Sequence, residues 1–465
     1  MMLLRELAAA VEDARIDGDG EVAIERIVED SRSCAPGDAF VAMRGERVDG
    51  HVFVAQAYER GASAAVVERS SSYPPGRAQV VVHDARRAGS RMAARFYGEP
   101  STMLRIVGIT GTNGKTTTSY LVRAVLEGAG ERCAIVGTLG VDFAGSSAPL
   151  ANTTPPAIEL QGVLAGLRDR GATAVSMEVS SHALALERVD DVAFDVGVLT
   201  NVTRDHLDFH RTQGAYVAAK RRLFEAARVA VLNVGDRVGA AFARELRRAG
   251  KTVVTYAVDV EADIGPALLG SLALPGRFNV ENALAALGVA RALRLDLAAA
   301  AEAIAGVRGV PGRMERFSAG GIDVVVDYAH TPDALANVLR ALRESTRGRL
   351  LVVFGCGGDR DAGKRPEMGT VAGGLADAVV VTSDNPRSED PLAIAQAIAA
   401  PIAATIVLDR RTAIHQTILD ARDGDVVVVA GKGHEAFQIV GDEKRPFDDR
   451  DEVRSALRAR GVPAP

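Results

Sequence analysis

The stretch GITGTNGKTTT, residues 108–118, decides the fold of the chain around it. It follows the apolar run LRIV (104–107) and precedes the helical pattern SYLVRAVLEGAG (119–130). A glycine loop between a buried strand and a helix presents backbone N–H groups and the positive end of the helix dipole, which together bind anions. We therefore expect a phosphate-binding loop, in which Lys115 contacts the β- and γ-phosphates of a nucleotide and Thr116 ligates Mg²⁺.

The spacing of this loop differs by one residue from the common P-loop. The pattern G-x-x-x-x-G-K-[ST] places its first glycine at position 109, where this chain has Ile109, and the nearest glycine is Gly108. An ordinary glycine-rich turn between strand and helix is the alternative interpretation. The two glycines that flank Thr-Asn, followed by Lys-Thr-Thr at a helix start, favour the phosphate loop.

Two other classes of nucleotide-binding protein fit the sequence less well. A regulatory GTPase carries an N-K-x-D guanine-binding motif, which this sequence lacks. A dinucleotide-binding oxidoreductase carries G-x-G-x-x-G, and the nearest candidate, GCGGDR at 355–360, has Arg360 where the third glycine belongs. An ordinary glycine-rich strand end explains residues 355–360 equally well.

The composition is that of a multidomain globular protein. The chain has 465 residues, which suggests about three domains at roughly 100–200 residues each. Hydrophobic residues make up 47% of the chain and Trp is absent, so the cores must be built from Val, Leu, Ile and Ala. The net charge of −5 and the lack of a polybasic block argue against a nucleic-acid partner. Three widely spaced cysteines fit a reducing cytosol better than a disulfide framework.

No segment reads as a signal peptide or a membrane span. The N-terminus, MMLLRELAAAVED, reaches Arg5 and Glu6 after four residues. The uncharged run at 391–408, PLAIAQAIAAPIAATIVL, is interrupted by Pro401, and a short helix, a break and a strand explain it better than a membrane helix. We expect a cytoplasmic protein without membrane insertion.

The order of apolar runs and turns predicts an α/β protein. Short strand-like runs, AFVAM, AAVVE and AQVVVH, and a helix-like stretch, FVAQAYERGA, occupy the first hundred residues. After the linker YGEPSTM (97–103), strands alternate with helices in RIVGITG, TAVSMEVS, VGVLTNV, VAVLNVG and KTVVTYA. An Ala-rich helical stretch (281–306) precedes a second boundary, and DVVVDYAH, RLLVVFGCGG, DAVVVTSD, ATIVLD and DVVVVAGKGH then alternate again. Buried runs separated by helices indicate mostly parallel, doubly wound sheets.

Three polar residues, at predicted strand ends or in a predicted helix, are candidate metal ligands. Glu178 ends the apolar strand TAVSM, and His206 follows the strand VGVLTNV. Ligands of doubly wound sheets bind at such strand ends. Taken singly, Glu178 is as readily a helix cap, His206 is more often structural, and Lys220, in the helical pattern AYVAAKRRLF, reads as a solvated charge.

The motifs taken together carry a family resemblance. The chain contains, in order, DSR, GTNGKTT, EVSSHAL, NVTRDHLDFH, YVAAKRRLF, LPGRFNVENALAA, DYAHTPDAL, GCGGDRDAGKRPEMG, DNPR and GKGHE. In this it resembles the Mur ligases of peptidoglycan synthesis, above all the branch that adds the third amino acid to UDP-N-acetylmuramoyl-L-alanyl-D-glutamate. The longer glycine loop is that family's own form. The resemblance implies an N-terminal UDP-sugar-binding domain (1–100), a central P-loop ATPase domain (101–309) and a C-terminal Rossmann-like amino-acid-binding domain (310–465).

The resemblance also implies a mechanism. ATP phosphorylates the γ-carboxylate of D-glutamate, an amine attacks the acyl phosphate, and phosphate leaves as the amide forms. In the family, positions matching Thr116 and Glu178 serve one Mg²⁺, whereas positions matching His206 and a carbamylated lysine, here Lys220, serve a second. Carbamylation gives Lys220 the oxygen donors that a hard cation prefers. The catalytic set is then Lys115, Glu178, His206 and Lys220, and the expected ATP contacts are Gly111, Thr112, Asn113, Gly114, Lys115, Thr116, Thr117, Asn279, Asn282 and Asp327.

The sugar-nucleotide contacts are carried over from the family in the same way. The expected contacts to the UDP-muramoyl-dipeptide are Ser31, Glu46, Arg47, Val48, Asn152, Thr153, Thr154, Ser180 and Arg188. Relatives can carry a polar contact two residues before that arginine, where this chain has Leu186, so Leu186 is left out of the site.

The segment DNPR points to the amino acid that is added. In the family this motif accompanies meso-diaminopimelate, whereas lysine-adding relatives usually lack its arginine, here Arg387. Diaminopimelate offers a second carboxylate that a guanidinium can bind in a bidentate pair, and lysine does not. The expected diaminopimelate contacts are Arg360, Asp384, Asn385, Pro386, Arg387, Gly431 and Glu435, with Glu435 expected to receive an ammonium group.

Other functions stay open at this stage. A lysine-adding Mur ligase or a ligase similar to folylpolyglutamate synthase shares much of the chemistry, although the latter is not expected to carry DSR and a separate UDP-binding domain. A P-loop ATPase acting as a binding or assembly module is the alternative from another class. We expect a monomer that acts on small molecules.

Overall fold

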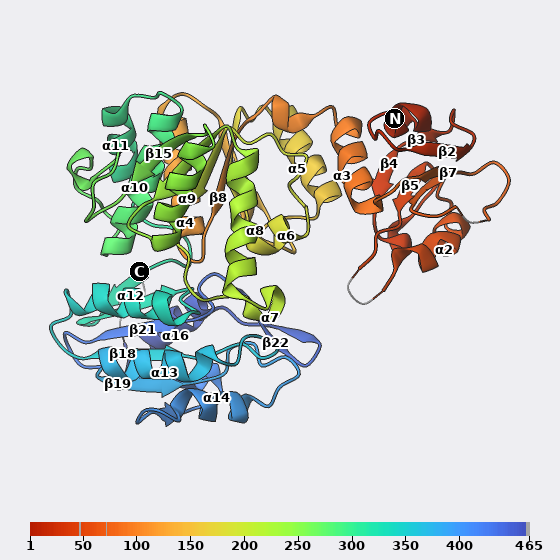
Figure 1. The fold of residues 1–465 in the computed structure, drawn as a ribbon. Helices are drawn as coiled ribbons and strands as arrows, with labels where there is room; N and C mark the ends of the chain where they lie inside the picture. The colour runs from red at the N-terminus through yellow and green to blue at the C-terminus, as the bar shows by residue number, and fades with distance from the viewer. Residues whose placement is uncertain (46–47, 71, 462–465) are drawn as a thin grey trace. The chain divides into compact units, whose positions relative to one another are not determined.

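The computed structural model describes residues 1–45, 48–70 and 72–461 of an α/β chain (Figure 1). The chain divides into two compact units. One comprises residues 1–110, 130–198 and 219–230, and the other comprises 111–129, 199–218 and 231–465. The predicted α/β class is confirmed.

A five-stranded sheet in the order β2-β7-β6-β5-β4 organises the N-terminal residues. Its strands pair in parallel except for β2 with β7, and β1 with β3 form a separate antiparallel pair. The three strands expected in AFVAM, AAVVE and AQVVVH are confirmed as β5, β6 and β7. The elements are β1 (Met2–Leu3), α1 (Leu4–Ala8), β2 (Arg15–Gly18), β3 (Ala23–Ile24), β4 (Arg26–Val28), η1 (Ser31–Ser33), β5 (Asp38–Val41), η2 (Gly50–Phe53), α2 (Val54–Glu59), β6 (Ala64–Val67), β7 (Ala78–Val81) and α3 (Ala85–Phe96).

An eight-stranded sheet in the order β11-β10-β9-β12-β8-β13-β14-β15 follows. The five strands expected after residue 104 are confirmed as β8, β12, β13, β14 and β15, whereas the antiparallel strands β10 and β11 were not expected. The elements are η3 (Pro100–Thr102), β8 (Arg105–Thr110), α4 (Lys115–Gly128), β9 (Cys133–Gly137), β10 (Gly140–Phe143), β11 (Ser146–Ala148), α5 (Ala157–Asp169), β12 (Ala174–Glu178), α6 (Ser181–Ala185), β13 (Val196–Leu199), α7 (Leu207–His210), α8 (Gln213–Ala226), β14 (Val229–Asn233), α9 (Arg237–Arg248), β15 (Thr252–Tyr256), η4 (Pro266–Leu268), α10 (Arg277–Ala292) and α11 (Leu297–Ala305).

The Ala-rich stretch 281–306 forms two helices, α10 and α11, rather than one. Arg294 adopts a left-handed φ of 59°, which ends the first helix, and the Asp296 carboxylate accepts a hydrogen bond from the backbone N–H of Ala299 at the start of the second. Both helices pack against α4, which begins at the glycine loop.

A six-stranded sheet in the order β16-β17-β21-β18-β19-β20 builds the C-terminal part. The four pairs from β17 to β20 are parallel, and β16 pairs with β17 in antiparallel fashion. The elements are β16 (Glu315–Ala319), β17 (Ile322–Asp327), α12 (Pro332–Arg343), β18 (Leu350–Phe354), α13 (Lys364–Leu375), β19 (Ala378–Val381), α14 (Pro391–Ala399), β20 (Thr405–Ile406), α15 (Arg410–Leu419), β21 (Val426–Ala430), β22 (Phe437–Val440), β23 (Glu443–Pro446) and α16 (Asp449–Ala459).

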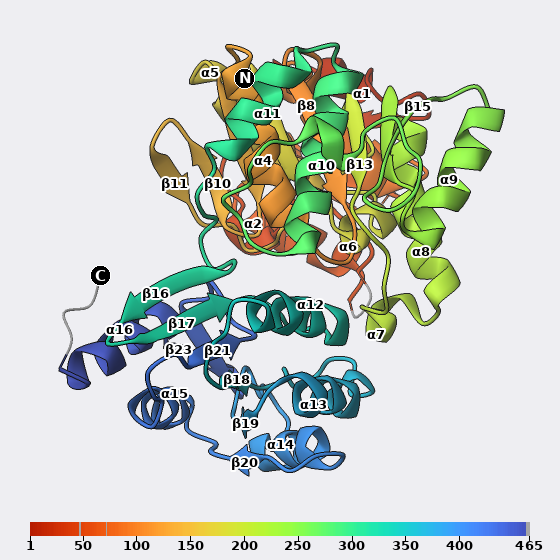
Figure 2. The ribbon, with the colours of Figure 1, turned by 90° about the vertical axis from the view of Figure 1, so that its left-hand side faces the viewer.

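Helices cover both faces of this sheet (Figure 2). Alternate residues of β17, β18 and β21 pack against α12, α13 and α14 on one face, and the intervening residues pack against α15 and α16 on the other. The sheet is therefore doubly wound, as expected. The uncharged run at 391–408 forms α14 and then β20, which confirms a helix, a break and a strand.

The strand order has a reversal point between β18 and β21. The chain runs from β18 outward to β19 and β20 and then returns to place β21 on the other side of β18. Ligands of open α/β sheets bind beyond the carboxyl ends of strands at such a point. The loops after β18 and β21 begin at Gly355 and Gly431, and both carry residues of the predicted diaminopimelate site.

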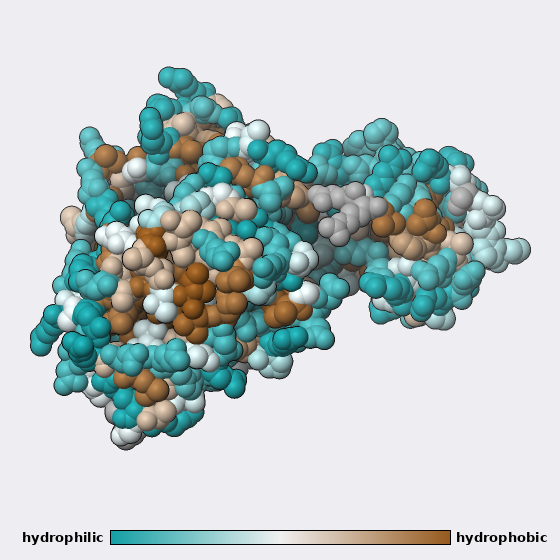
Figure 3. All heavy atoms as spheres, turned by 90° about the horizontal axis from the view of Figure 1, so that it is seen from below, coloured by the Kyte–Doolittle hydropathy of each residue, from teal (hydrophilic) through white to brown (hydrophobic). Residues whose placement is uncertain are grey.

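Across the described ranges, no helix has both the length and the apolar character to cross a bilayer. On the face drawn in Figure 3, hydrophobic patches are interrupted by hydrophilic residues. Exposed hydrophobic side chains of this kind are common on protein surfaces and carry no functional argument.

Candidate active site

The glycine loop joins β8 to α4 through two glycines with positive φ. Gly111 has φ 155° and Gly114 has φ 86°. A Cβ at Gly111 would lie 1.8 Å from Thr200 Oγ1, and one at Gly114 would lie 2.4 Å from Asn282 Oδ1. Both positions therefore exclude side chains, because conformation and space each require glycine.

Hydrogen bonds hold the loop in one shape. Lys115 Nζ donates to the carbonyl oxygens of Gly111 and Thr112, each at 2.9 Å. Thr112 N donates to Asn201 O at 2.8 Å, and Asn113 N donates to Asn201 Oδ1 at 2.9 Å. The side chain of Lys115 thus lies over the loop, where a phosphate-binding lysine is expected.

The other predicted ATP residues of this unit gather near the loop. Asn282 Oδ1 accepts from Thr118 Oγ1 at 3.2 Å, and Asn282 Nδ2 donates to Asn279 Oδ1 at 3.2 Å. Both asparagines are buried, as are Thr112, Thr116 and Thr117. The carboxylate of Asp327 accepts from the backbone N–H groups of Met314 and Ala329, and burial raises its pKa.

Arg313 is a residue that the sequence analysis missed. Its Nη2 donates to Thr116 Oγ1 at 2.9 Å, its guanidinium lies 4.4 Å from the centre of the Tyr328 ring, and its Nε is buried without a hydrogen-bond partner. A half-buried cation with an unsatisfied donor beside Thr116 fits a polyphosphate anion. Arg313 lies just after the Ala-rich stretch 281–306, where the sequence indicated a domain boundary and no site.

In the other unit, Glu178 ends β12 with 1% of its surface exposed. Its Oε1 accepts from Thr138 N and its Oε2 accepts from Thr138 Oγ1, both at 3.0 Å. Thr138 Oγ1 also lies 3.1 Å from Thr153 Oγ1. Thr138, at the end of β9, is thus a second residue that the sequence analysis missed, and only the three-dimensional pairing of strands could reveal it.

The predicted dipeptide contacts surround this carboxylate. Thr154 Oγ1 donates to the backbone oxygen of Glu178 at 2.9 Å and accepts from Ser180 N at 3.0 Å. Arg188 Nη1 donates to Thr154 O at 2.9 Å, whereas Asn152 is exposed. Burial lowers the pKa of Arg188, and the charge of Glu29 partly opposes this shift. The structure thus brings Thr153, Thr154, Ser180 and Arg188 together with Glu178.

The predicted uridine-side contacts lie in the N-terminal sheet region. Ser31 is buried and donates to Gln56 Oε1 at 2.7 Å, whereas Val48 is 51% exposed. Glu46 and Arg47 lie outside the described residues.

The remaining predicted metal residues stay a prediction. Lys220, in α8, is 1% exposed and belongs to the same unit as Glu178, whereas His206 and Thr116 belong to the other unit. His206 Nε2 lies 3.3 Å from Asp205 Oδ2. Among the residues that the structure describes, no three His, Cys, Asp or Glu side chains lie close enough to hold a metal ion. Only two of the four predicted metal residues, Glu178 and His206, are of those types, so this finding does not test the prediction.

The predicted diaminopimelate residues come together at the carboxyl ends of β18, β19 and β21. Asn385 Nδ2 donates to Glu435 Oε2 at 2.9 Å, and Arg387 Nη1 donates to Gly358 O at 2.7 Å. A Cβ at Gly431, where φ is 113°, would lie 2.7 Å from Asp384 Oδ2. We call Arg360, Asp384, Asn385, Pro386, Arg387, Gly431 and Glu435, together with Lys432 between the last two, the strand-end cluster.

Two members of this cluster, Arg360 and Arg387, carry guanidinium groups. Burial lowers the pKa of Arg387, and the nearby positive charge of Arg360 lowers it further, against the opposing charges of Asp384 and Glu435. Two close cations favour the binding of an anion between or beside them. The arrangement can therefore hold a carboxylate, as expected.

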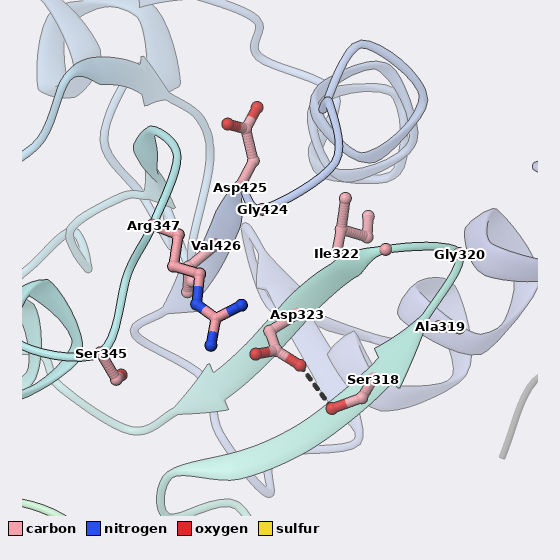
Figure 4. A pocket seen from close by; sticks show the side chains of 11 residues that line it. Ser318, Ala319, Gly320, Ile322, Asp323, Ser345, Arg347, Gly424, Asp425 and Val426 are labelled. Carbon is pink, nitrogen blue, oxygen red and sulfur yellow. Dashed lines mark hydrogen bonds between the residues drawn. The ribbon is translucent and has the colours of Figure 1, made fainter.

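A pocket of about 540 Å³ lies elsewhere in the C-terminal part (Figure 4). It is lined at the start of β17 and β21, by residues such as Ile322, Asp323 and Val426, and by Arg347. These are the amino ends of the strands, opposite to the edge that carries the strand-end cluster. None of the predicted site residues lines it.

Comparisons with known proteins show the family of the chain. Three family models match the chain: "Mur ligase family, catalytic domain" over residues 23–97, "Mur ligase middle domain" over 109–290 and "Mur ligase, glutamate ligase domain" over 312–433. A relative from Geobacter metallireducens is 44% identical, with 98% of each chain covered. The chain belongs to the Mur ligase family. The three matched ranges fall within the predicted domains 1–100, 101–309 and 310–465, whose boundaries stay predictions.

Two relatives of this Mur ligase share one name. The Geobacter protein and a Thermosynechococcus vestitus protein, 46% identical over 99% of this chain and 98% of its own, are both UDP-N-acetylmuramoyl-L-alanyl-D-glutamate–2,6-diaminopimelate ligases. A solved structure of a ligase of that name has a TM-score of 0.69 at 34% identity and covers 99% of each chain. A Mycobacterium tuberculosis folylpolyglutamate synthase shares the fold over 73% of this chain, with a TM-score of 0.59 at 20% identity.

Proposed function

We propose that this Mur ligase uses ATP to join meso-diaminopimelate to the D-glutamate of UDP-N-acetylmuramoyl-L-alanyl-D-glutamate, as a step of peptidoglycan precursor synthesis. The observation that carries the proposal is the strand-end cluster, in which Arg387 lies near the positive charge of Arg360 and the negative charges of Asp384 and Glu435. Charges of both signs suit a substrate end that bears a carboxylate and an ammonium group. The similarity to ligases named for the same substrates supports it.

The chemistry follows from the two kinds of site. A free carboxylate is a poor acyl donor, so the γ-carboxylate of D-glutamate accepts the γ-phosphoryl group of ATP and becomes an acyl phosphate. The glycine loop, Lys115 and Arg313 hold the phosphates and offset their charge. The amine of diaminopimelate then attacks the acyl carbon, the amide bond forms, and phosphate leaves. The strand-end cluster orients that amine by holding the other end of the molecule.

Incubation with candidate substrates tests the function. The protein is supplied with ATP, the UDP-dipeptide and either meso-diaminopimelate, L-lysine or L-glutamate, and the products are weighed by mass spectrometry. A product with diaminopimelate together with release of ADP supports the proposal. A product with lysine at comparable efficiency would assign the lysine-adding alternative. Release of ADP at the same rate with and without the UDP-dipeptide and the amine would indicate an ATPase module.

We further propose that Mg²⁺ is needed, with Thr116 and Glu178 serving one ion and His206 and carbamylated Lys220 a second. The donors fit, because a buried carboxylate, a hydroxyl and a carbamate supply the oxygen ligands that Mg²⁺ prefers. Bound Mg²⁺ would offset phosphate charge during the transfer. A buried Lys220 also suits carbamylation, because an ammonium group is costly to bury whereas a metal-bound carbamate is neutralised.

Two measurements test the role of Lys220. Lys220→Ala should abolish ligation, with partial rescue by a short carboxylic acid such as acetate. The native protein equilibrated with ¹³C-bicarbonate should show a carbamate carbon by NMR that Lys220→Ala lacks. Near-normal activity of Lys220→Ala without acetate would rule the role out.

We also propose a cytoplasmic monomer whose partners are small-molecule substrates. Its three cysteines, Cys34, Cys133 and Cys356, are buried free thiols, which suits a reducing compartment. Light scattering coupled to size-exclusion chromatography, with and without substrates, tests the oligomeric state. A stable dimer at micromolar concentration would contradict it.

A further inference from the structure

Lys432 is a buried cation within the strand-end cluster. It is not one of the predicted diaminopimelate contacts. It follows Gly431 at the end of β21, and none of its side-chain surface is exposed. A buried ammonium group is stable only when oxygen atoms surround it. Its partners therefore show what it does.

Both hydrogen-bond partners of the ammonium group are predicted diaminopimelate contacts. Lys432 Nζ lies 3.1 Å from Asn385 Oδ1 and 3.0 Å from Glu435 Oε2. Asn385 Nδ2 in turn donates to Glu435 Oε2 at 2.9 Å. Three side chains from two strand ends thus form a closed triangle of hydrogen bonds.

The triangle fixes the orientation of the asparagine. An ammonium group only donates, so the amide oxygen of Asn385 must face Lys432 and its NH₂ group must face Glu435. The backbone N–H of Ile439 also donates to Asn385 Oδ1, at 3.0 Å. Without the ammonium group, Glu435 would lose its cation, and the loop after β21 would lose one of its links to the loop after β19.

Lys432 also sets the charge of the cluster. With it, the three cations Arg360, Arg387 and Lys432 are balanced by three carboxylates, Asp384, Glu435 and Asp359. Without Lys432, one negative charge would be in excess. The far end of bound diaminopimelate is a neutral zwitterion, whereas the far end of lysine is a cation. A negative excess would attract the cationic end of lysine and leave the zwitterion unaffected in net terms, so the charge of Lys432 disfavours lysine by removing that excess.

We propose that Lys432 is a positioning residue that sets Asn385 and Glu435 for the far end of the amino-acid substrate and disfavours substrates with a purely cationic end. The inference rests on the proposed function, since it concerns the choice between diaminopimelate and lysine.

Lys432→Met tests the proposal, because methionine keeps the apolar stem and removes the charge. Lys444→Met is the matched control: Lys444 lies 4.7 Å from the centre of the Phe437 ring and Lys432 lies 5.7 Å from it, but Lys444 is exposed. In Lys432→Met we expect KM for diaminopimelate to rise about 30-fold or more, as when one partner of a buried charge pair is removed, with a much smaller change in kcat. Lys444→Met should match the unmodified protein.

The preference for diaminopimelate over lysine should fall as well. In Lys432→Met, kcat/KM for lysine should stay constant or rise, so the ratio of the two values should fall by about 10-fold or more. An unchanged KM and an unchanged ratio in Lys432→Met would overturn the proposal. A fall of kcat/KM by the same factor for both substrates would also overturn it, because that result indicates a structural role alone.

A double variant tests whether Lys432 acts through Glu435. Glu435→Gln alone should raise KM for diaminopimelate. If the two residues act as one unit, Lys432→Met with Glu435→Gln should be no worse than the more damaged single variant. Effects on KM that multiply would show independent roles and overturn the proposal.

Formation of the acyl phosphate, measured alone, distinguishes a misfolded variant, a failure of the proposed function and a failure of the inference about Lys432. Hydroxylamine traps the acyl phosphate as a hydroxamate without the amino-acid site, so a folded Lys432→Met should form hydroxamate at the normal rate. If Lys432→Met fails to do so, Lys432→Gln, which keeps a donor for Glu435, takes its place with the same expectations. If the unmodified protein forms hydroxamate but no diaminopimelate product, the proposed function fails and the inference with it. If it forms that product and Lys432→Met does so equally well, the inference alone fails.

Discussion

The glycine loop and the strand-end cluster both follow parallel strands, but they recognise their ligands with different parts of the chain. In the proposed function, the loop binds phosphate mainly through backbone groups within residues 111–116, where two glycines leave no room for a Cβ, and Lys115 adds one side-chain charge. The cluster uses side chains from three strand ends, including two guanidinium groups, two carboxylates and the buried Lys432. A backbone site binds any polyphosphate of the right shape, whereas a side-chain site can distinguish two similar amino acids.

The largest effect is expected from a substitution in the strand-end cluster. Arg387→Ala should lose most of the preference for meso-diaminopimelate over L-lysine, which in sites built on buried polar groups can reach ~10⁴-fold. The reason is that the second carboxylate of diaminopimelate loses its bidentate partner, and lysine never had one. The measurement is kcat/KM for both amino acids. Arg445→Ala is the control, because Arg445 pairs with Glu443 on the β22–β23 hairpin and is exposed. Comparable efficiency with L-lysine in the unmodified protein would sink the assignment.

The next largest effect is expected from a substitution in the glycine loop. Lys115→Ala should slow formation of the acyl phosphate by about 10³-fold, because the transferred phosphoryl group loses a fixed positive charge. Binding of the UDP-dipeptide should survive, since its predicted contacts lie on other residues. Hydroxamate formation measures the first quantity, and calorimetric titration with the UDP-dipeptide measures the second. Loss of UDP-dipeptide binding in a folded Lys115→Ala would contradict this division.

A pair of glycine variants sharpens the distinction between conformation and space in the loop. Gly114 and Gly130 have nearly equal φ, 86° and 87°, but a Cβ at Gly130 meets nothing within 4 Å. Gly130→Ala should cost about 1 kcal/mol of stability from the left-handed backbone alone. Gly114→Ala should cost about 1–3 kcal/mol more from the clash with Asn282 and should raise KM for ATP. Thermal melts and ATP kinetics of both variants measure this, and equal losses would show that the clash is relieved.

The smallest effect concerns acid stability next to the cluster. Burial and the charges of Arg313, Arg450 and Lys432 lower the pKa of His434 to about 3, and its Nδ1 is buried without a hydrogen-bond partner. The unfolded chain takes up this proton near pH 6.5. The folded state does so only near pH 3, so the stability that neutral His434 contributes is complete above pH 6.5 and is lost as pH falls toward 3.

His434→Gln removes that proton uptake from both states. Its melting temperature should therefore fall less than that of the parent between pH 6.5 and pH 4. Asp327, whose pKa burial raises, acts in the opposite direction in both proteins, so the difference between the two isolates His434. A parallel decline of both melting temperatures would show that His434 does not drive the acid sensitivity.

The sequence allowed the local parts of this arrangement to be predicted and left the distant pairings unseen. The glycine loop, the parallel strands and the residues of DNPR and GKGHE follow from short motifs, because their geometry depends on neighbouring residues. Thr138 beside Glu178, Arg313 beside Thr116, and Lys432 between Asn385 and Glu435 depend on which strand ends meet. The hairpin β10–β11 and the division of 281–306 into two helices were missed because period and composition do not locate turns of this kind.

The position of β21 has a consequence for how the C-terminal part is made. β17 and β18 each pair with β21 in the middle of the sheet, although β21 is the last of the six strands to be synthesised. While a ribosome is still translating residues before 426, β17 and β18 expose unpaired edges to other chains. Completion of the sheet therefore waits for Val426–Ala430, and the strand that ends at the strand-end cluster is also the one that covers both exposed edges.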